Sequence, residues 1–216
     1  MNSVMIRQGE NSDYPEFLQA EQQAWKNTGV PVISREQYAS WMEVFPEGLL
    51  LAEYAGVVCG HVFSQVCSFD PFDESDNRSW NEATDFGFIR ATHEPAGRTM
   101  YNVSVSACIP GAGKKLLRAA FSQAEASRLQ YYTGASSIPG LAVWVKSQQR
   151  KMDRSAAEEY VDCVLERKIR DPVISVTLSI EGTEFCRVME NYFDYPGSGG
   201  WAALIAYVCA SSLACP

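Results

Sequence analysis

The sequence has little positive charge, no long apolar run and no paired cysteine motif, and each deficit argues against a class of protein. Its 216 residues carry 18 lysines and arginines against 26 aspartates and glutamates, so the net charge at pH 7 is −8. Nucleic-acid-binding domains are usually basic, which argues against a nucleic-acid partner. An anionic small ligand would have to be held by a local device rather than by the field of the whole protein.

The apolar segments are too short for a membrane protein. Even "WAALIAYVCA" reaches only about half of the length that spans a bilayer, and the first residues, "MNSVMIRQGENSDY", lack the apolar core of a signal peptide. The seven cysteines form no C-x-x-C pair, which disfavours zinc and redox motifs and favours reduced, buried thiols. We therefore expect a soluble cytoplasmic chain without a metal site, and the length predicts a single domain over residues 1–216.

Apolar periodicity predicts an α/β chain. Ser34 and Gln37 form a capping box ahead of a helical pattern. Residues 70–98 read as a long polar segment with enough aromatic side chains to pack against the rest of the domain. The expected elements are a strand over 3–7, helices over 13–25 and 35–45, a hairpin over 49–69, a strand over 99–107, a helix over 114–128, a strand over 129–134, a helix over 153–169, and strands over 173–180, 184–193 and 201–210.

The stretch "ACIPGAGKKLL" joins the alternating strand "TMYNVSVSA" to the following helix. The start of a helix offers unpaired N–H groups and about half a positive charge, which favours phosphate binding. Gly111 and Gly113 would let a pyrophosphate approach the backbone closely. Lys114 and Lys115 oppose the helix dipole, so they fit better as partners of a phosphorylated ligand.

Three phosphate motifs compete with a glycine turn that binds nothing. A P-loop is excluded because Cys108 and Lys115 stand at its required positions, and a dinucleotide fingerprint because Leu116 replaces its third glycine. Residues 108–113 match, except at the first position, the pyrophosphate loop [QR]-x-x-G-x-[GA] of acetyl-CoA-dependent acyltransferases. With this loop, the hairpin "LLLAEYAGVVCGHVFSQ" and the element order, the chain resembles the GNAT acyltransferase superfamily.

A narrower resemblance is to GNAT-like proteins with a long insertion, here at about 70–98. These proteins occur alone, joined to carbon–nitrogen hydrolases, and as loading domains of polyketide synthases, so the end "ASSLACP" is also compatible with a domain of a larger synthase. The residues that carry the likeness are Trp80, Thr84, Gly87, Thr92, His93, Pro95, Gly97 and Tyr101, then Ile138-Pro139-Gly140, Asp171-Pro172 and Asn191-Tyr192.

The resemblance implies an α/β (α+β) fold, a mixed and mostly antiparallel sheet with flanking helices. Its strands at 99–107 and 129–134 would run parallel and splay apart to admit acetyl-CoA or another acyl-CoA. The loop is shorter than usual, Cys108 replaces a basic or amide side chain, and Pro110 lacks an N–H, so a degenerate, non-catalytic module is a third hypothesis. The implied contacts are Val103, Ser104 and Val105 for the pantetheine arm, and Ile109, Gly111, Ala112, Gly113 and Lys114 for the pyrophosphate.

The implied activity is acyl transfer, of the EC 2.3.1 class, from acetyl-CoA to an amine of a small molecule. The alternative is malonyl or acetyl handling, by decarboxylation or by S-acetyl transfer to an acyl carrier protein. That alternative uses a strand-end threonine, for which Thr133 is the candidate, and a downstream histidine, which is missing because His61 and His93 both lie upstream.

Three further side chains are candidates for the site. Tyr132 is the candidate donor to the departing thiolate. His61 is either a core histidine or a general base, and Trp25 is either a core residue or part of the acceptor wall. No constellation in the sequence names the acceptor itself.

Overall fold

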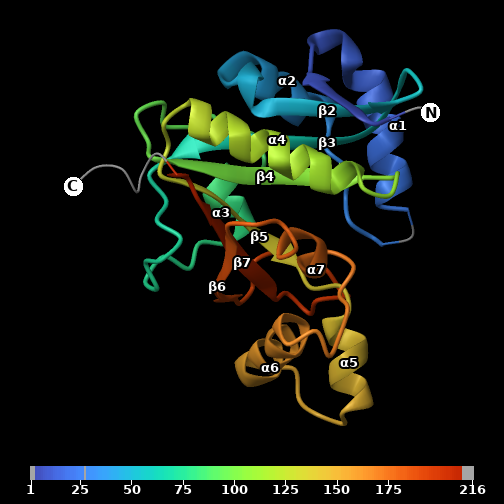
Figure 1. Cartoon of the computed structure of the whole chain (residues 1–216), viewed down its shortest axis with the longest axis vertical. Coiled ribbons are helices and arrows are strands. Elements are labelled where there is room, and N and C mark those ends of the chain that lie inside the picture. Colours follow the sequence, from blue (N-terminus) through green and yellow to red (C-terminus); the bar gives the residue numbers. More distant parts are fainter. Residues whose placement is uncertain (1–2, 27, 211–216) are drawn as a thin grey trace.

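The computed structural model describes residues 3–26 and 28–210, and it is built on a seven-stranded sheet (Figure 1). The order is β1-β2-β3-β4-β5-β7-β6. β4 and β5 run parallel, and the other neighbouring pairs are antiparallel. This is the mixed sheet predicted from the sequence. The strands are β1 (Met5–Gln8), β2 (Leu49–Tyr54), β3 (Val57–Cys67), β4 (Thr99–Ala107), β5 (Tyr131–Ser137), β6 (Thr183–Met189) and β7 (Ala202–Val208).

Helices cover both faces of this sheet (Figure 1). α4 buries its apolar stripe against β2, β3 and β4, and α1 and α2 cover the other face. α5 and α6 pack together at the β6–β7 end of the molecule. The helices are α1 (Tyr14–Ala24), α2 (Arg35–Val44), α3 (Trp80–Thr84), α4 (Ala112–Ala126), α5 (Leu141–Ser147), α6 (Arg154–Leu165) and α7 (Ile174–Thr177), with 3₁₀ turns at Asn11–Asp13 and Pro46–Gly48.

Capping chemistry places the start of α2 where the sequence predicts it. The Ser34 hydroxyl accepts from the Gln37 N–H at 3.1 Å, and the Gln37 side chain accepts from the Ser34 N–H at 2.8 Å. The same reciprocal pair, Ser79 with Glu82, starts the short helix α3, which we did not predict. Both boxes satisfy N–H groups that the first helical turn leaves without partners.

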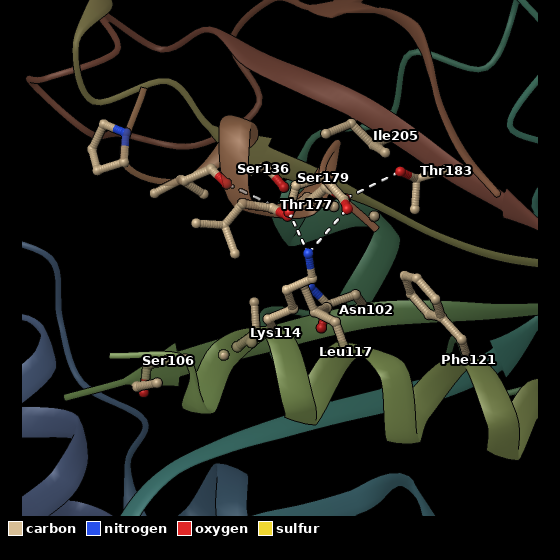
Figure 2. Close-up of a pocket in the computed structure, with 18 of the residues that line it drawn as sticks. Asn102, Ser106, Lys114, Leu117, Phe121, Ser136, Thr177, Ser179, Thr183 and Ile205 are labelled. Carbon is tan, nitrogen blue, oxygen red and sulfur yellow. Dashed lines mark hydrogen bonds between the residues drawn. The ribbon is translucent and has the colours of Figure 1, made fainter. Parts of the chain in front are cut away.

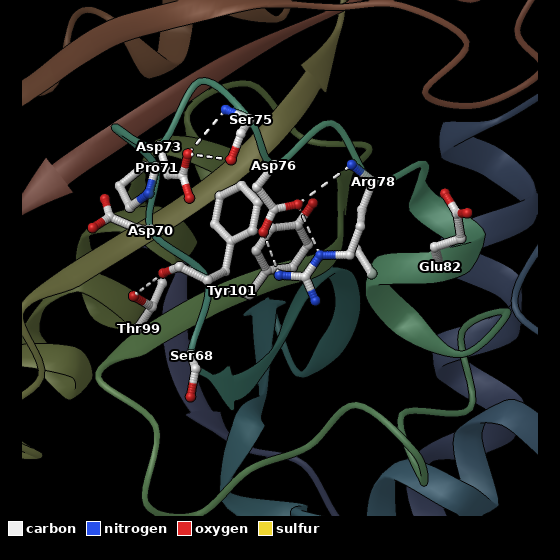
Figure 3. Close-up of polar contacts among 12 residues, drawn as sticks. Ser68, Asp70, Pro71, Asp73, Ser75, Asp76, Arg78, Glu82, Thr99 and Tyr101 are labelled. Carbon is white, nitrogen blue, oxygen red and sulfur yellow. Dashed lines mark hydrogen bonds and ion pairs between the residues drawn. The ribbon is translucent and has the colours of Figure 1, made fainter.

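The segment over residues 70–98 packs against the sheet, as its aromatic side chains predict. The Trp80 N–H donates to the Tyr192 carbonyl at 2.7 Å, which ties α3 to the chain after β6. Figure 3 shows the Arg78 guanidinium paired with the Asp76 carboxylate in the same segment, at 2.6 Å. His93 accepts from the Val66 N–H at 3.3 Å and so braces the segment against β3.

Residues 173–180 were predicted as a strand, and this prediction is wrong. They form α7 and a following turn. The buried Asp171 carboxylate accepts from the N–H groups of Val173 and Ile174, at 2.8 and 3.0 Å, and these local bonds start a helical turn. Alternation of β-branched residues with Ser and Thr gave the opposite signal.

Two further findings concern the whole described chain. Within residues 3–26 and 28–210, no helix has both the length and the apolar character needed to cross a membrane. The cysteines in these ranges form no disulfide with one another. Cys215 and the rest of 211–216, and with them the end of "ASSLACP", lie outside the described residues.

Candidate functional site

The loop between β4 and α4 ends at Gly111, so no side chain caps the N–H groups at the start of α4. Gly111 caps the helix with a φ of 84°, a conformation that a side chain would strain, and α4 begins at Ala112. The loop is fixed to β3, because the Cys108 N–H donates to the Cys59 carbonyl at 2.9 Å. The strand, glycine loop and helix start predicted at this junction are confirmed.

A cavity of about 630 Å³ lies against this helix start, between β4, β5 and the segment that carries α7 (Figure 2). Among its described lining residues the charged ones are Lys114 and Arg170, and none is a carboxylate. The cavity wall is therefore positive. Of the predicted loop contacts, Ile109, Gly111, Gly113 and Lys114 line it, whereas Ala112 is buried in the core.

The two lysines of the first helical turn have different positions. The Lys114 ammonium donates to the Ser179 carbonyl at 3.0 Å and to its hydroxyl at 2.8 Å, across the cavity (Figure 2). Lys115 donates to the Val4 carbonyl at 3.0 Å and does not line the cavity. Of these two lysines, Lys114 is therefore the one placed to face a ligand in this cavity.

β4 and β5 separate beside the same cavity. They pair only from Thr99 to Tyr101 on β4, and Asn102 lies just beyond, opposite Gly134. A Cβ on Gly134 would come within 2.7 Å of the Asn102 Cβ, so glycine makes room for the amide. The Asn102 Oδ1 atom is buried and has no hydrogen-bond partner among the described residues. An unpaired buried acceptor costs about 1–3 kcal/mol, a cost that a bound donor would remove.

A β-bulge in β4 decides which side chains reach each face. The register with β3 shifts so that Val103 is the extra residue, and its carbonyl accepts from the Trp80 indole at 2.9 Å. Val103 and Ser104 therefore both lie on the α1 side, while Val105 packs beneath α4. The uninterrupted alternation predicted over 99–107 is wrong at this position.

A second cavity, of about 480 Å³, lies on the α1 side of β4. Its described lining residues include two carboxylates, Glu21 and Asp194, and no basic side chain. The rest of the wall is largely apolar and includes Trp25, at the position predicted for the acceptor wall. The aromatic lining residues are Trp25, Trp80, Phe86, Tyr192 and Phe193.

The two cavities meet at the splay. Asn102, Val105, Ser136 and Val173 line both of them. A ligand that enters between β4 and β5 from the positive cavity would thus present its far end to the acidic one. The predicted pantetheine contacts divide accordingly, since Val105 faces both cavities and Ser104 faces only the second.

His61 is fully buried and lines neither cavity. Its Nε2 atom lies 3.0 Å from the Ser104 hydroxyl, and its Nδ1 atom lies 3.2 Å from the Ser106 hydroxyl. Ser106 donates to Glu21 at 2.8 Å. Burial lowers the pKa of the imidazole, and the Glu21 carboxylate opposes this shift, so the ring is neutral at pH 7.

The remaining predicted catalytic residues are separated by the sheet. Tyr132 lines the positive cavity, its hydroxyl accepts from Ser64 at 3.2 Å, and burial raises its pKa well above the usual range. The Thr133 hydroxyl donates to the Ile205 carbonyl at 2.9 Å and lines neither cavity. A role for either residue in catalysis stays a prediction.

Sequence reasoning missed Glu21, Ser106 and Asn102. Glu21 had a detectable signal, because it lies four residues after Phe17 on the buried stripe of α1 and four before Trp25. A carboxylate on a buried stripe needs a partner or a function. The position of Asn102 depends on the β-bulge in β4 and on the separation of β4 from β5, and no local sequence pattern predicts either feature.

No family model matches the sequence. A curated relative from Bacillus subtilis (strain 168), "Uncharacterized N-acetyltransferase YkwB", is 31% identical over 178 residues, which cover 81% of this chain and 74% of the relative. "Probable hydrolase YhcX" from the same organism is 28% identical over 88% of this chain, but the match spans only 35% of that protein. The match to YkwB shows that this chain belongs to a family of N-acetyltransferases.

Two solved structures share the fold at low sequence identity. A "GNAT-like decarboxylase", GphF, in complex with isobutyryl-CoA, gives a TM-score of 0.73 at 17% identity over 94% of this chain and 98% of that one. The loading GNATL domain of CurA from Lyngbya majuscula gives 0.66 at 14% identity over 96% and 98%. With its splayed parallel pair, glycine loop and N-acetyltransferase relative, the chain belongs to the GNAT superfamily.

Proposed function

We propose that this protein transfers an acyl group from an acyl-CoA to a primary amine of a small molecule. One observation carries the proposal: two cavities of opposite charge meet at the β4–β5 splay. Acyl-CoA is anionic, and an amine in water is mostly cationic, so each substrate has a cavity of complementary charge. The donated group would lie where the two cavities join.

The positive cavity suits the CoA half. The N–H groups at the start of α4 and the Lys114 ammonium would hold the pyrophosphate, although Pro110 contributes no N–H. Asn102 Oδ1 would accept a hydrogen bond at the splay, from an amide of the pantetheine arm or from the attacking amine. The isobutyryl-CoA complex of GphF supports this assignment by its shared fold.

The acidic cavity suits the amine. Glu21 is only 1% exposed and accepts from the Trp25 indole at 3.1 Å and from the Ile33 N–H at 3.3 Å, without an ion pair to lysine or arginine. The neighbouring imidazole, with His61 Nδ1 3.6 Å from Glu21 Oε1, is neutral, so a cationic amine would be stabilised beside this buried carboxylate. The aromatic wall adds an apolar surface for the body of the substrate.

The bound ammonium would first release one proton to solvent, and the reaction would begin when the resulting neutral amine attacks the thioester carbonyl. A C–N bond forms, the C–S bond breaks, the amine loses one proton and the thiolate gains one. Tyr132 lines the CoA cavity and, with its raised pKa, remains protonated and able to donate that second proton. The catalytic roles are thus divided between the two sides of β4.

Malonyl handling for an acyl carrier protein ranks second. The likeness to the GphF decarboxylase and to the CurA loading domain favours it. However, a malonyl carboxylate that projects through the splay would meet Glu21 and Asp194. In addition, the Thr133 hydroxyl already donates its hydrogen bond to the Ile205 carbonyl. Like-charge repulsion at that position disfavours the malonyl group.

Mass spectrometry distinguishes these functions. The wild-type protein is incubated with acetyl-CoA and tryptamine or 2-phenylethylamine, and in parallel with malonyl-CoA and an acyl carrier protein. Acetylated amine without a carrier product supports the proposal. Acetylated carrier from malonyl-CoA that disappears in Thr133→Val would establish the second function. Absence of acetyl-CoA binding in calorimetry would favour the non-catalytic module.

Two variants, each of which neutralises one acidic residue of the cavity, test the amine site. Glu21→Gln keeps the size of the side chain and one acceptor oxygen but removes the charge, so we expect the KM for tryptamine to rise at least tenfold. Asp194→Asn removes an exposed charge at the rim, where solvent screens it, and should change the KM far less. Equal effects of the two variants would contradict the assignment of Glu21.

A further inference from the structure

A buried polar chain connects Ser104 to Glu21, two residues that line the acceptor cavity, through the core behind it. Ser104 lines the acceptor cavity, and His61 lies behind it with no exposed surface. Ser106 lines the CoA cavity and is 7% exposed. Both serines reach the same imidazole because the bulge at Val103 brings Ser104 to the α1 side of β4.

The hydrogen-bond donors in this chain are ordered in one direction. Ser106 gives its hydroxyl hydrogen to Glu21, so the neutral His61 must donate from Nδ1 to the Ser106 oxygen. Its Nε2 atom is then an acceptor, and the Ser104 hydroxyl donates to it. Every hydrogen therefore points from the acceptor cavity toward the Glu21 carboxylate.

Glu21 also lines the acceptor cavity, but both of its oxygen atoms already accept hydrogen bonds from the protein. Its Oε1 atom accepts from Trp25 and Ser106, and its Oε2 atom accepts from Ile33. Ser104 is the hydroxyl of the chain that lies on β4 beside Asn102, where the two cavities meet. Ser104 is therefore the hydroxyl of this chain that an amine in the acceptor cavity can contact.

We propose that Ser104, His61 and Ser106 relay the proton of the attacking amine to Glu21, a step that rests on the proposed acyl transfer. As the C–N bond forms, the amine proton passes to the Ser104 oxygen and the Ser104 hydrogen passes to His61 Nε2. The Nδ1 hydrogen then passes to Ser106 and the Ser106 hydrogen to Glu21. When the products leave, the relay runs back: the Glu21 proton returns through Ser106 to His61 Nδ1, the Nε2 hydrogen returns to Ser104, and Ser104 releases one proton to solvent in the emptied cavity. Tyr132 regains from solvent the proton that it gave to the thiolate.

In this account His61 and Ser106 are positioning residues that act through Ser104. A neutral imidazole is required, because an imidazolium has no free Nε2 lone pair. Burial lowers the pKa of His61 and so favours the neutral ring. The Glu21 carboxylate on α1 raises this pKa, but its effect is smaller than that of burial. The arrangement thus holds a receptive Nε2 atom at neutral pH.

Kinetics of three variants test the relay. His61→Gln, Ser106→Ala and Ser104→Ala should each lower kcat for tryptamine by about 100-fold or more. His61 lines neither cavity, so His61→Gln should also keep the Kd for acetyl-CoA within a factor of two of the wild type. The acid limb of the pH–kcat profile should flatten in each variant, and Ser104→Thr should restore it. Thr99→Val, which removes a buried hydrogen bond to the Phe69 carbonyl outside both cavities, should keep the wild-type profile.

Two outcomes would overturn the relay while leaving acyl transfer intact. One is an unchanged pH profile in folded His61→Gln and Ser106→Ala. The other is additivity, since His61→Gln combined with Glu21→Gln should cost no more than the larger single loss if the residues act as a unit. The relay also has a test without turnover: ¹⁵N NMR of the wild type should show His61 as the neutral Nδ1–H tautomer at pH 7. An Nε2–H tautomer or an imidazolium would refute it even if no amine is acetylated.

Discussion

Gly113 offers a sharp test of the pyrophosphate site, because helix stability and ligand affinity should respond in opposite directions there. Gly113 is the second residue of α4 and is half-buried at the cavity wall. A Cβ at this position meets only the Ala107 Cβ, at 3.8 Å, so the backbone accepts a side chain. Gly111 is a poorer choice, since its φ of 84° strains any side chain.

Gly113→Asp places a carboxylate in the first turn of α4, where the helix dipole stabilises it by about 0.3–1 kcal/mol. The same charge repels a pyrophosphate bound at the helix start. Two unit charges about 8 Å apart at an effective dielectric constant of about 20 repel by about 2 kcal/mol, which corresponds to an approximately 30-fold weaker affinity. The variant should therefore be at least as stable as the wild type and bind acetyl-CoA much less tightly.

Gly113→Asn is the matched control, because it adds the same volume without the charge. Calorimetric titration with acetyl-CoA gives the affinities, and thermal unfolding gives the stabilities. We expect Asn to lose much less affinity than Asp. If both variants bind acetyl-CoA as tightly as the wild type, or if both lose affinity equally, the charge of the pyrophosphate does not interact with this helix start. The assignment of the pyrophosphate site would then be wrong.

Three further predictions concern the scaffold around the site. Gly134→Ala forces a Cβ to within 2.7 Å of Asn102, so we expect a raised KM for acetyl-CoA and a loss of about 1–3 kcal/mol in urea unfolding, and wild-type values for both would refute the crowding at the splay. Asp171→Ala leaves the buried donors at the start of α7 without an acceptor and should cost about 2–4 kcal/mol, so an unchanged urea midpoint would contradict its role. The Arg7 guanidinium lowers the pKa of Asp13, so this carboxylate stabilises the fold above its ordinary pKa of 3.8 and loses that contribution as the pH falls through the lower folded value. Asp13→Asn should therefore weaken the fold at pH 7 and narrow the difference in urea midpoint between pH 7 and about pH 3, and an unchanged difference would exclude this ion pair from the acid response.

Local chemistry made much of the fold predictable. The Ser34 box and the glycine loop are short-range devices, in which a few neighbouring residues satisfy the backbone, and both were read correctly. The parallel pair β4–β5 followed from the strand–loop–helix–strand unit. The box at Ser79 carried the same kind of signal and was overlooked inside a segment read as loop.

The site depends on interactions that no local pattern contains. The bulge at Val103 arises from pairing with β3 and from the Trp80 indole, and it alone brings Ser104 to His61. Asp171 overrode an alternating strand pattern by binding two nearby N–H groups. Sequence reasoning could thus list Trp25 and His61 as candidates, but it could not connect them to Glu21.

The central claim is that one face of the splay holds acyl-CoA and the other holds the amine. A crystal structure with a conjugate that joins CoA sulfur to tryptamine nitrogen through an acetyl bridge tests both halves at once. The account predicts the pyrophosphate on the N–H groups at the start of α4, the bridge between Asn102 and Gly134, and the indole among Trp25, Trp80 and Phe86. An indole outside that cavity, or a pyrophosphate away from residues 109–114, would contradict it.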